Sequence, residues 1–64
     1  MVKINGELFD IAGKSVAEYL KTTSYDAKRI AVELNGEIVP KAQYEETVLA
    51  DGDSVEVVSF VGGG

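Results

Sequence analysis

The sequence SVAEYL, residues 15–20, decides the fold because it predicts the main helix of the 64-residue chain. Ser15 is a favourable N-cap, and Glu18 follows three positions later, which is the spacing of a capping box. Three apolar residues then share one side of a helix of about two turns: Val16, Tyr19 and Leu20. An apolar stripe must cover another element, so the segments around the helix determine the architecture.

Strand-like segments precede and follow this helix in the chain. Residues 2–11 (VKINGELFDI) alternate around an Asn-Gly pair, the strongest short signal for a β-hairpin. Residues 29–34 (RIAVEL) form a second alternating run, and another Asn-Gly pair turns it into residues 37–40 (EIVP). The proline ends that strand because it has no N–H to donate to a strand ladder.

The remaining segments complete an α+β pattern. Residues 41–46 (KAQYEE) suit a single helical turn, residues 51–53 (DGD) a tight turn, and residues 54–60 (SVEVVSF) a final strand. This order predicts a four- to five-stranded mixed sheet with one main helix packed on one face. We expect the β-grasp (ubiquitin-like) arrangement, in which the first and last strands pair in parallel at the centre. A small SH3-like or OB-like barrel is the alternative, and the early capped helix counts against it.

Composition excludes several classes of function. The chain has no cysteine and no histidine. It therefore cannot form disulfides, thiolate or histidine metal sites, or the usual catalytic triads. We assign no catalytic or metal-binding residue. Eleven acidic against six basic residues leave a net charge of −5, which disfavours nucleic acid and favours a basic protein surface. Without an apolar run of membrane-spanning length or a signal-peptide pattern, we expect a cytoplasmic protein that contacts no membrane.

The last strand and the glycines after it are the candidate functional region. Alternation points Val55 and Val57 toward the helix and leaves Val58 and Phe60 on the other face. Burying such a side chain contributes roughly 1.5–3 kcal/mol, so an exposed pair is a candidate docking surface for a partner. The alternative is that Phe60 folds back over an edge of the core.

The chain ends in three glycines, so we expect residues 1–61 to form a single β-grasp domain and residues 62–64 a flexible glycine tail. The four residues 61–64 reach at most about 13–14 Å when fully extended. Because glycine has no Cβ, a narrow channel in another protein can close around this backbone. A disordered end without a role is the alternative.

Several runs of the sequence, in this order, match a known family. They are INGE (residues 4–7), LNGEIVP (residues 34–40) with the overlapping VPKAQY (residues 39–44), and DGDSVEVVSFVGGG (residues 51–64). Over essentially its whole length, the chain resembles the sulfur-carrier proteins of thiamine biosynthesis, β-grasp relatives of ubiquitin that end in a diglycine. It departs from them in a third glycine and in Tyr44, where many relatives have a larger aromatic residue.

The resemblance implies a protein cosubstrate rather than an enzyme. Gly64 would be adenylated and then converted to a thiocarboxylate, while Val61, Gly62 and Gly63 would lie in the partner's active site. An adenylating (E1-like) activating enzyme would use ATP for the first step, and a sulfur donor protein would supply the sulfur. Thiazole synthase would receive that sulfur for the thiazole moiety of thiamine. The chain itself would bind no cofactor.

Other functions fit parts of the same pattern. The small subunit of molybdopterin synthase shares the fold and the thiocarboxylate tail, but it is usually longer, and the VPKAQY run favours the thiamine branch. A ubiquitin-like modifier would instead join its terminus to lysines of other proteins, and a plain interaction module would not use the tail. An enzyme is disfavoured because Glu45 and Glu46 suit a solvated surface and the Asp-Gly-Asp segment suits a turn.

Overall fold

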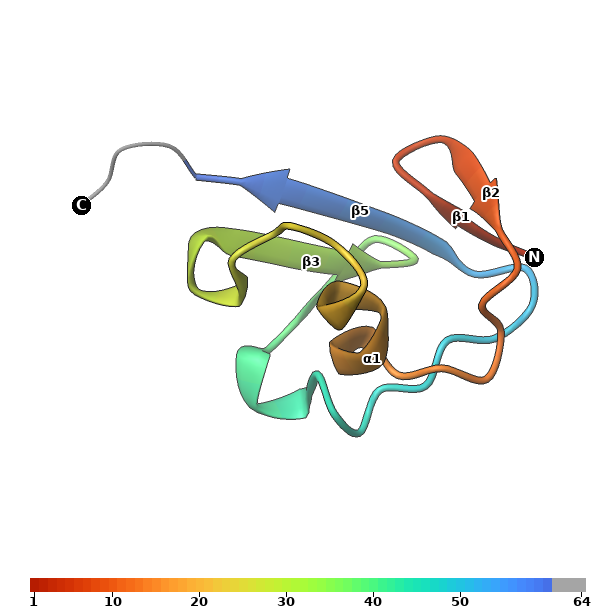
Figure 1. The fold of residues 1–64 in the computed structure, drawn as a ribbon. Coiled ribbons are helices and arrows are strands. Elements are labelled where there is room, and N and C mark those ends of the chain that lie inside the picture. The colour runs from red at the N-terminus through yellow and green to blue at the C-terminus, as the bar shows by residue number, and fades with distance from the viewer. Residues whose placement is uncertain (61–64) are drawn as a thin grey trace.

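Five strands form one mixed sheet in the computed structural model, which describes residues 1–60 of the chain (Figure 1). The strands are β1 (Val2–Ile4), β2 (Glu7–Phe9), β3 (Ile30–Leu34), β4 (Glu37–Val39) and β5 (Ser54–Ser59). They lie in the order β2-β1-β5-β3-β4, with β1 and β5 parallel and every other neighbouring pair antiparallel. The first and last strands therefore pair as expected, and the β-grasp prediction is confirmed.

The helix α1 (Val16–Lys21) lies on one face of the sheet (Figure 1). It begins at the predicted capping box: Glu18 N–H donates to Ser15 Oγ at 3.1 Å, and Ser15 N–H donates to Glu18 Oε1 at 3.0 Å. Two threonine hydroxyls donate to carbonyls of its last turn, which helps to end the helix after six residues. Local side-chain chemistry therefore sets both ends of α1.

Two short 3₁₀ helices connect the other elements. The helix η2 (Lys41–Gln43) is the predicted single turn, whereas η1 (Ala27–Arg29) was not predicted. The Asp26 carboxylate caps η1 by accepting from Lys28 N–H at 2.9 Å, and β3 consequently begins at Ile30, one residue later than expected. Among the described residues, no helix has the length and apolar character needed to cross a membrane.

One apolar core fills the space between the sheet and α1. Its members are at most 9% exposed: Val2, Ile4, Val16, Tyr19, Leu20, Ile30, Val32, Val39, Tyr44, Leu49, Val55 and Val57. The burial of Val55 and Val57 confirms the predicted inner face of the last strand. Tyr44 and Leu49 come from the chain between β4 and β5, and the Tyr44 carbonyl accepts from Ala17 N–H at 2.9 Å. Irregular chain therefore closes the core beside α1.

Both Asn-Gly turns hold β5 as well as their own hairpins. Asn5 and Asn35 have φ angles of 50° and 52°, the left-handed conformation that tight two-residue turns require. The Asn5 side chain accepts from Val57 N–H at 2.8 Å and donates to the Val57 carbonyl at 3.3 Å. The Asn35 side chain accepts from Ser54 N–H at 2.9 Å and donates to Asp53 at 3.1 Å. Each asparagine therefore forms its turn through its backbone and binds β5 or the turn before it through its side-chain amide.

We predict that Asn5→Gly lowers the free energy of unfolding by about 1–3 kcal/mol, because glycine keeps the positive φ but loses both contacts with Val57. Asn5→Ala is expected to cost about 1–2 kcal/mol more, since alanine also strains the left-handed backbone. Urea unfolding followed by far-UV circular dichroism measures both. A glycine variant as stable as the wild type would show that the amide contacts contribute nothing.

We also predict that Glu18 makes stability depend on pH at acidic values. The hydrogen bond from Ser15 N–H is the main cause that lowers the pKa of Glu18 below its ordinary value of 4.5. Because the folded pKa is depressed, this stabilisation is present above pH 4.5 and is lost as the pH falls through the folded pKa. Glu18→Gln should therefore flatten the fall in unfolding free energy below about pH 4.5. The control is Glu46→Gln at an exposed position, and equal acid slopes for wild type and E18Q would contradict the prediction.

Candidate functional site

The C-terminal half of β5 leads to the end of the chain that the sequence singles out. The strand β3 pairs with β5 along residues 55–59, and Phe60 N–H donates to the Arg29 carbonyl at 2.6 Å. The backbone is therefore held in register up to the last described residue. In Figure 1, β5 runs past the β1–β2 hairpin, and its C-terminal end lies on the opposite side of the molecule from the N-terminus.

Val58 and Phe60 lie on the face of the sheet opposite α1, where they are 48% and 55% exposed. The residues that alternate with them, Val55 and Val57, face the core. The alternative that Phe60 folds back into the core is therefore wrong. An apolar pair is left in solvent beside the end of the described chain.

These two residues are the predicted site residues that the structure describes. Val61, Gly62, Gly63 and Gly64 lie outside the described residues. Their roles, and the division into a domain of residues 1–61 and a tail of residues 62–64, stay predictions.

The exposed apolar surface extends beyond the two predicted residues. Four of the six large apolar side chains exposed within residues 1–60 share the open face of the sheet: Leu8, Ile38, Val58 and Phe60. Leu8 pairs with Lys3, and Ile38 pairs with Glu33, which in turn pairs with Glu56 on β5. The period-two pattern of the hairpins could have located Leu8 and Ile38. The open face is therefore mixed, since apolar side chains lie beside Lys3 on β1 and the acidic residues Glu33 on β3 and Glu56 on β5.

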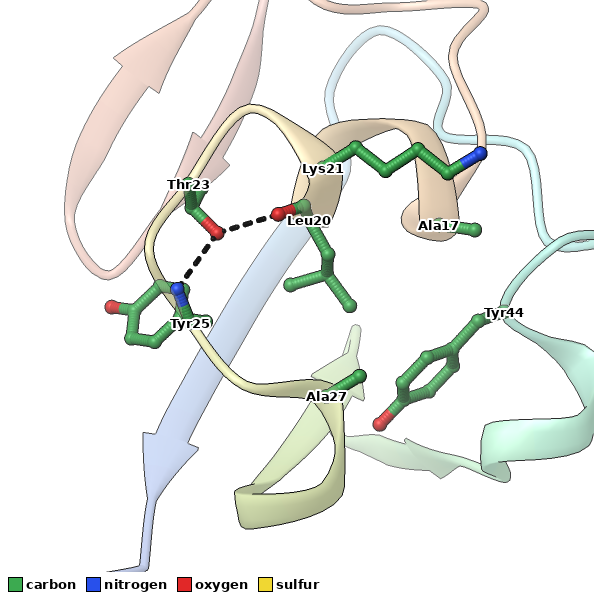
Figure 2. Close-up of a pocket in the computed structure, with 7 residues that line it drawn as sticks. All are labelled: Ala17, Leu20, Lys21, Thr23, Tyr25, Ala27 and Tyr44. Atoms are coloured by element: carbon green, nitrogen blue, oxygen red, sulfur yellow. Dashed lines mark hydrogen bonds between the residues drawn. The ribbon is translucent and has the colours of Figure 1, made fainter.

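An apolar hollow of about 360 Å³ opens on the other side of the sheet, between α1, the segment after it and Tyr44 (Figure 2). The side chains of Leu20, Ala27 and Tyr44 converge on it from three segments of the chain. The Thr23 hydroxyl connects α1 to the segment after it, because it donates to the Leu20 carbonyl at 2.8 Å and accepts from Tyr25 N–H at 3.2 Å. Neither a carboxylate nor any predicted site residue lines this hollow.

The titratable groups with shifted pKa values belong to the framework of the fold. Burial raises the pKa of Tyr19 and of Tyr44, and both rings pack into the core. Glu45 and Glu46 are exposed, as their sequence context indicated. Within residues 1–60, no three acidic, histidine or cysteine side chains gather closely enough to hold a metal ion. The end of β5 and its exposed face therefore remain the candidate functional site.

Known proteins resemble this chain over almost its whole length. The ThiS family model matches residues 2–64. The sulfur carrier protein ThiS of Thermus thermophilus is 39% identical over 64 residues, which cover 100% of both chains. A thiazole synthase of Paramagnetospirillum magneticum is 44% identical over 62 residues, which are 95% of this chain but only 19% of that protein. The crystal structure of the thiamine biosynthesis protein ThiS from Geobacter metallireducens has a TM-score of 0.79 and 33% identity, covering 98% of this chain and 97% of that one.

The exposed face should tolerate polar substitution without loss of stability. We predict that Val58→Ser and Phe60→Ser each change the free energy of unfolding by less than about 0.5 kcal/mol, because both side chains already contact water. Val57→Ala, at a position that is 8% exposed, should cost about 1–3 kcal/mol through the cavity that it leaves. Urea unfolding of the three variants measures the difference. A loss at Phe60 as large as that at Val57 would mean that the ring stabilises the core.

Proposed function

Because this chain belongs to the ThiS family, we propose that it carries sulfur for thiamine biosynthesis on the carboxylate of Gly64. A carboxylate is a poor electrophile, so a partner E1-like enzyme first transfers AMP from ATP to a carboxylate oxygen and releases pyrophosphate. Hydrosulfide supplied by a sulfur donor protein then attacks the carbonyl carbon and displaces AMP. Loss of the S–H proton leaves a terminal thiocarboxylate, whose sulfur is delivered to thiazole synthase. The chain is a cosubstrate in this scheme, because its own terminus is the group that reacts.

The observation that carries this proposal is the position of β5. It is the central strand of the sheet, and its ladder with β3 holds it up to residue 59. Five residues follow before the chain ends, and the last three are glycines. Residues 61–64 reach at most about 13–14 Å beyond the sheet, enough to enter a cleft that the folded domain cannot enter. Glycine removes the Cβ that would crowd both the attack of the carboxylate on the phosphorus of ATP and the later attack on the carbonyl carbon.

We assign the exposed pair Val58 and Phe60 to partner docking. They lie immediately before the tail, so a protein that covers them also receives the tail. Burying one such side chain completely contributes roughly 1.5–3 kcal/mol, so covering the half-exposed pair offsets part of the roughly 1–2 kcal/mol per residue needed to order the three glycines. The net charge of −5, with Glu33 and Glu56 on the same face, favours partners with a basic rim.

A region similar to this chain within a thiazole synthase supports that enzyme as a partner. Two functions joined in one polypeptide act at a high effective concentration, which is useful when one part must repeatedly deliver a group to the other. Where the two parts are not joined, we infer that docking through the face of β5 takes the place of the covalent link.

The proposal is tested by the mass of the protein after reaction. The chain is incubated with ATP, an adenylating enzyme of the ThiS pathway and a sulfur donor, and its intact mass is measured. We expect a gain equal to the difference between sulfur and oxygen, localised to the C-terminal peptide. Omitting ATP should abolish the gain, because no acyl-adenylate then forms.

The matched control is the same chain with a C-terminal amide, which keeps every residue and removes only the reacting carboxylate. Removal of Gly64 provides a second control for the position of that carboxylate. Absence of sulfur from the wild type would refute the carrier function. A gain in the amidated chain would refute the assignment to Gly64, and conjugates with lysines of other proteins would favour a modifier instead.

A further inference from the structure

The two sides of β5 differ in how completely they are paired. Even-numbered residues direct their backbone groups toward β3: Asn35 N–H donates to the Ser54 carbonyl, and Phe60 N–H donates to the Arg29 carbonyl. Odd-numbered residues direct theirs toward β1, since Asn5 N–H donates to the Val55 carbonyl. The strand β1 pairs only with Ser54 and Val55, however, so its ladder stops well before β5 ends. In Figure 1 the rest of β5 extends beyond the hairpin.

Asn5 marks the boundary between the paired and unpaired parts of this side. Its amide binds the N–H and the carbonyl of Val57 at 2.8 and 3.3 Å, as a residue of a neighbouring strand would. The next odd residue is Ser59, which is exposed. Among residues 1–60, neither β1 nor the Asn5 side chain extends to it, and its backbone groups point away from β3. Within the described residues, the edge of β5 that faces away from β3 is therefore open at Ser59.

We propose that this edge accepts an extended segment of thiazole synthase as an added strand, an inference that rests on the proposed function. The exposed N–H and carbonyl of Ser59 can both form hydrogen bonds with one residue of an extended backbone, as in strand addition at a sheet edge. The Asn5-Gly6 turn lies at the N-terminal side of this opening, because the Asn5 amide already binds Val57. Ser59 lies between Val58 and Phe60 in the chain, so a segment bound at this edge also lies close to the exposed apolar pair.

A second copy of the chain is a weaker occupant of the same edge. Each copy carries a net charge of −5, so two copies repel one another. The Asn5-Gly6 turn of each copy would also stop the pairing after Ser59, leaving few hydrogen bonds to hold a dimer. A strand from a different protein does not bring a second such turn.

The test removes the N–H of Ser59 without disturbing β3. Ser59→Pro deletes a donor that points away from β3, whereas the N–H of Phe60, which binds Arg29, is retained. The matched control is Ser59→Ala, which also removes the serine side chain but keeps the backbone N–H. Affinity for purified thiazole synthase is measured by isothermal titration calorimetry for the wild type and both variants.

We expect Ser59→Pro to weaken binding on the order of tenfold or more and Ser59→Ala to leave it near the wild-type value. Equal affinity of the wild type and S59P would overturn the strand addition while leaving the proposed function intact. An equal loss in S59P and S59A would also overturn it, because the side chain rather than the N–H would then account for the loss. A wild-type chain that does not bind thiazole synthase would refute the proposed partner and, with it, this inference. Self-association that S59P abolishes would assign the edge to a second copy instead.

Amide hydrogen exchange on the unmodified chain provides an answer even if a proline variant fails to fold. The Ser59 amide should exchange rapidly in the free protein and at least about tenfold more slowly with thiazole synthase bound. The Phe60 amide, already bonded to Arg29, is the internal reference and should be protected in both states. Unchanged exchange at Ser59 in the complex would overturn the proposal.

Discussion

The parallel pairing of β1 with β5 is the constraint on which the rest of the structure depends. It joins Lys3 to Ser54 and Ile4 to Val55, and the Asn5 side chain extends it to Val57, which is 52 residues away along the chain. Closing so long a loop costs conformational entropy, which burial of the apolar side chains of both strands offsets. Once the two ends of the chain share the middle of the sheet, α1 and the irregular chain from η2 to Leu49 have one face to cover.

The same pairing separates the stable part of the molecule from the part proposed to react. The strand β5 is anchored on its inner face by Val55 and Val57, while its outer face presents Val58 and Phe60 to solvent. Changes on the outer face are therefore expected to alter the proposed docking without altering the core. Because β1 is shorter than β5, one edge of the central strand also stays open at Ser59. The exposed face and the open edge thus meet at the end of β5 that precedes the glycines in the chain.

Much of the fold could be predicted because its signals are local. The capping box at Ser15 and Glu18, both Asn-Gly turns and the alternation in β5 each depend on residues within a few positions of one another. Features that depend on distant partners were missed. The side-chain amides of Asn5 and Asn35 bind backbone groups of β5, and Asn35 also binds the Asp53 carboxylate in the turn before it. No local sequence pattern predicts contacts with residues so far away in the chain. The 3₁₀ helix η1 was missed because Asp26, which caps it, follows a run of polar residues without periodicity.

The sequence by itself determined the order of the elements, the faces of the last strand and the identity of the residues at the chain end. Side-chain alternation and turn chemistry are properties of neighbouring residues, so they need no knowledge of the fold. Only the tertiary structure decided that Phe60 lies in solvent, that Leu8 and Ile38 share its face, and that the β1 ladder stops before Ser59. Those facts depend on strand lengths and register across the sheet, which are fixed when segments far apart in the chain come together.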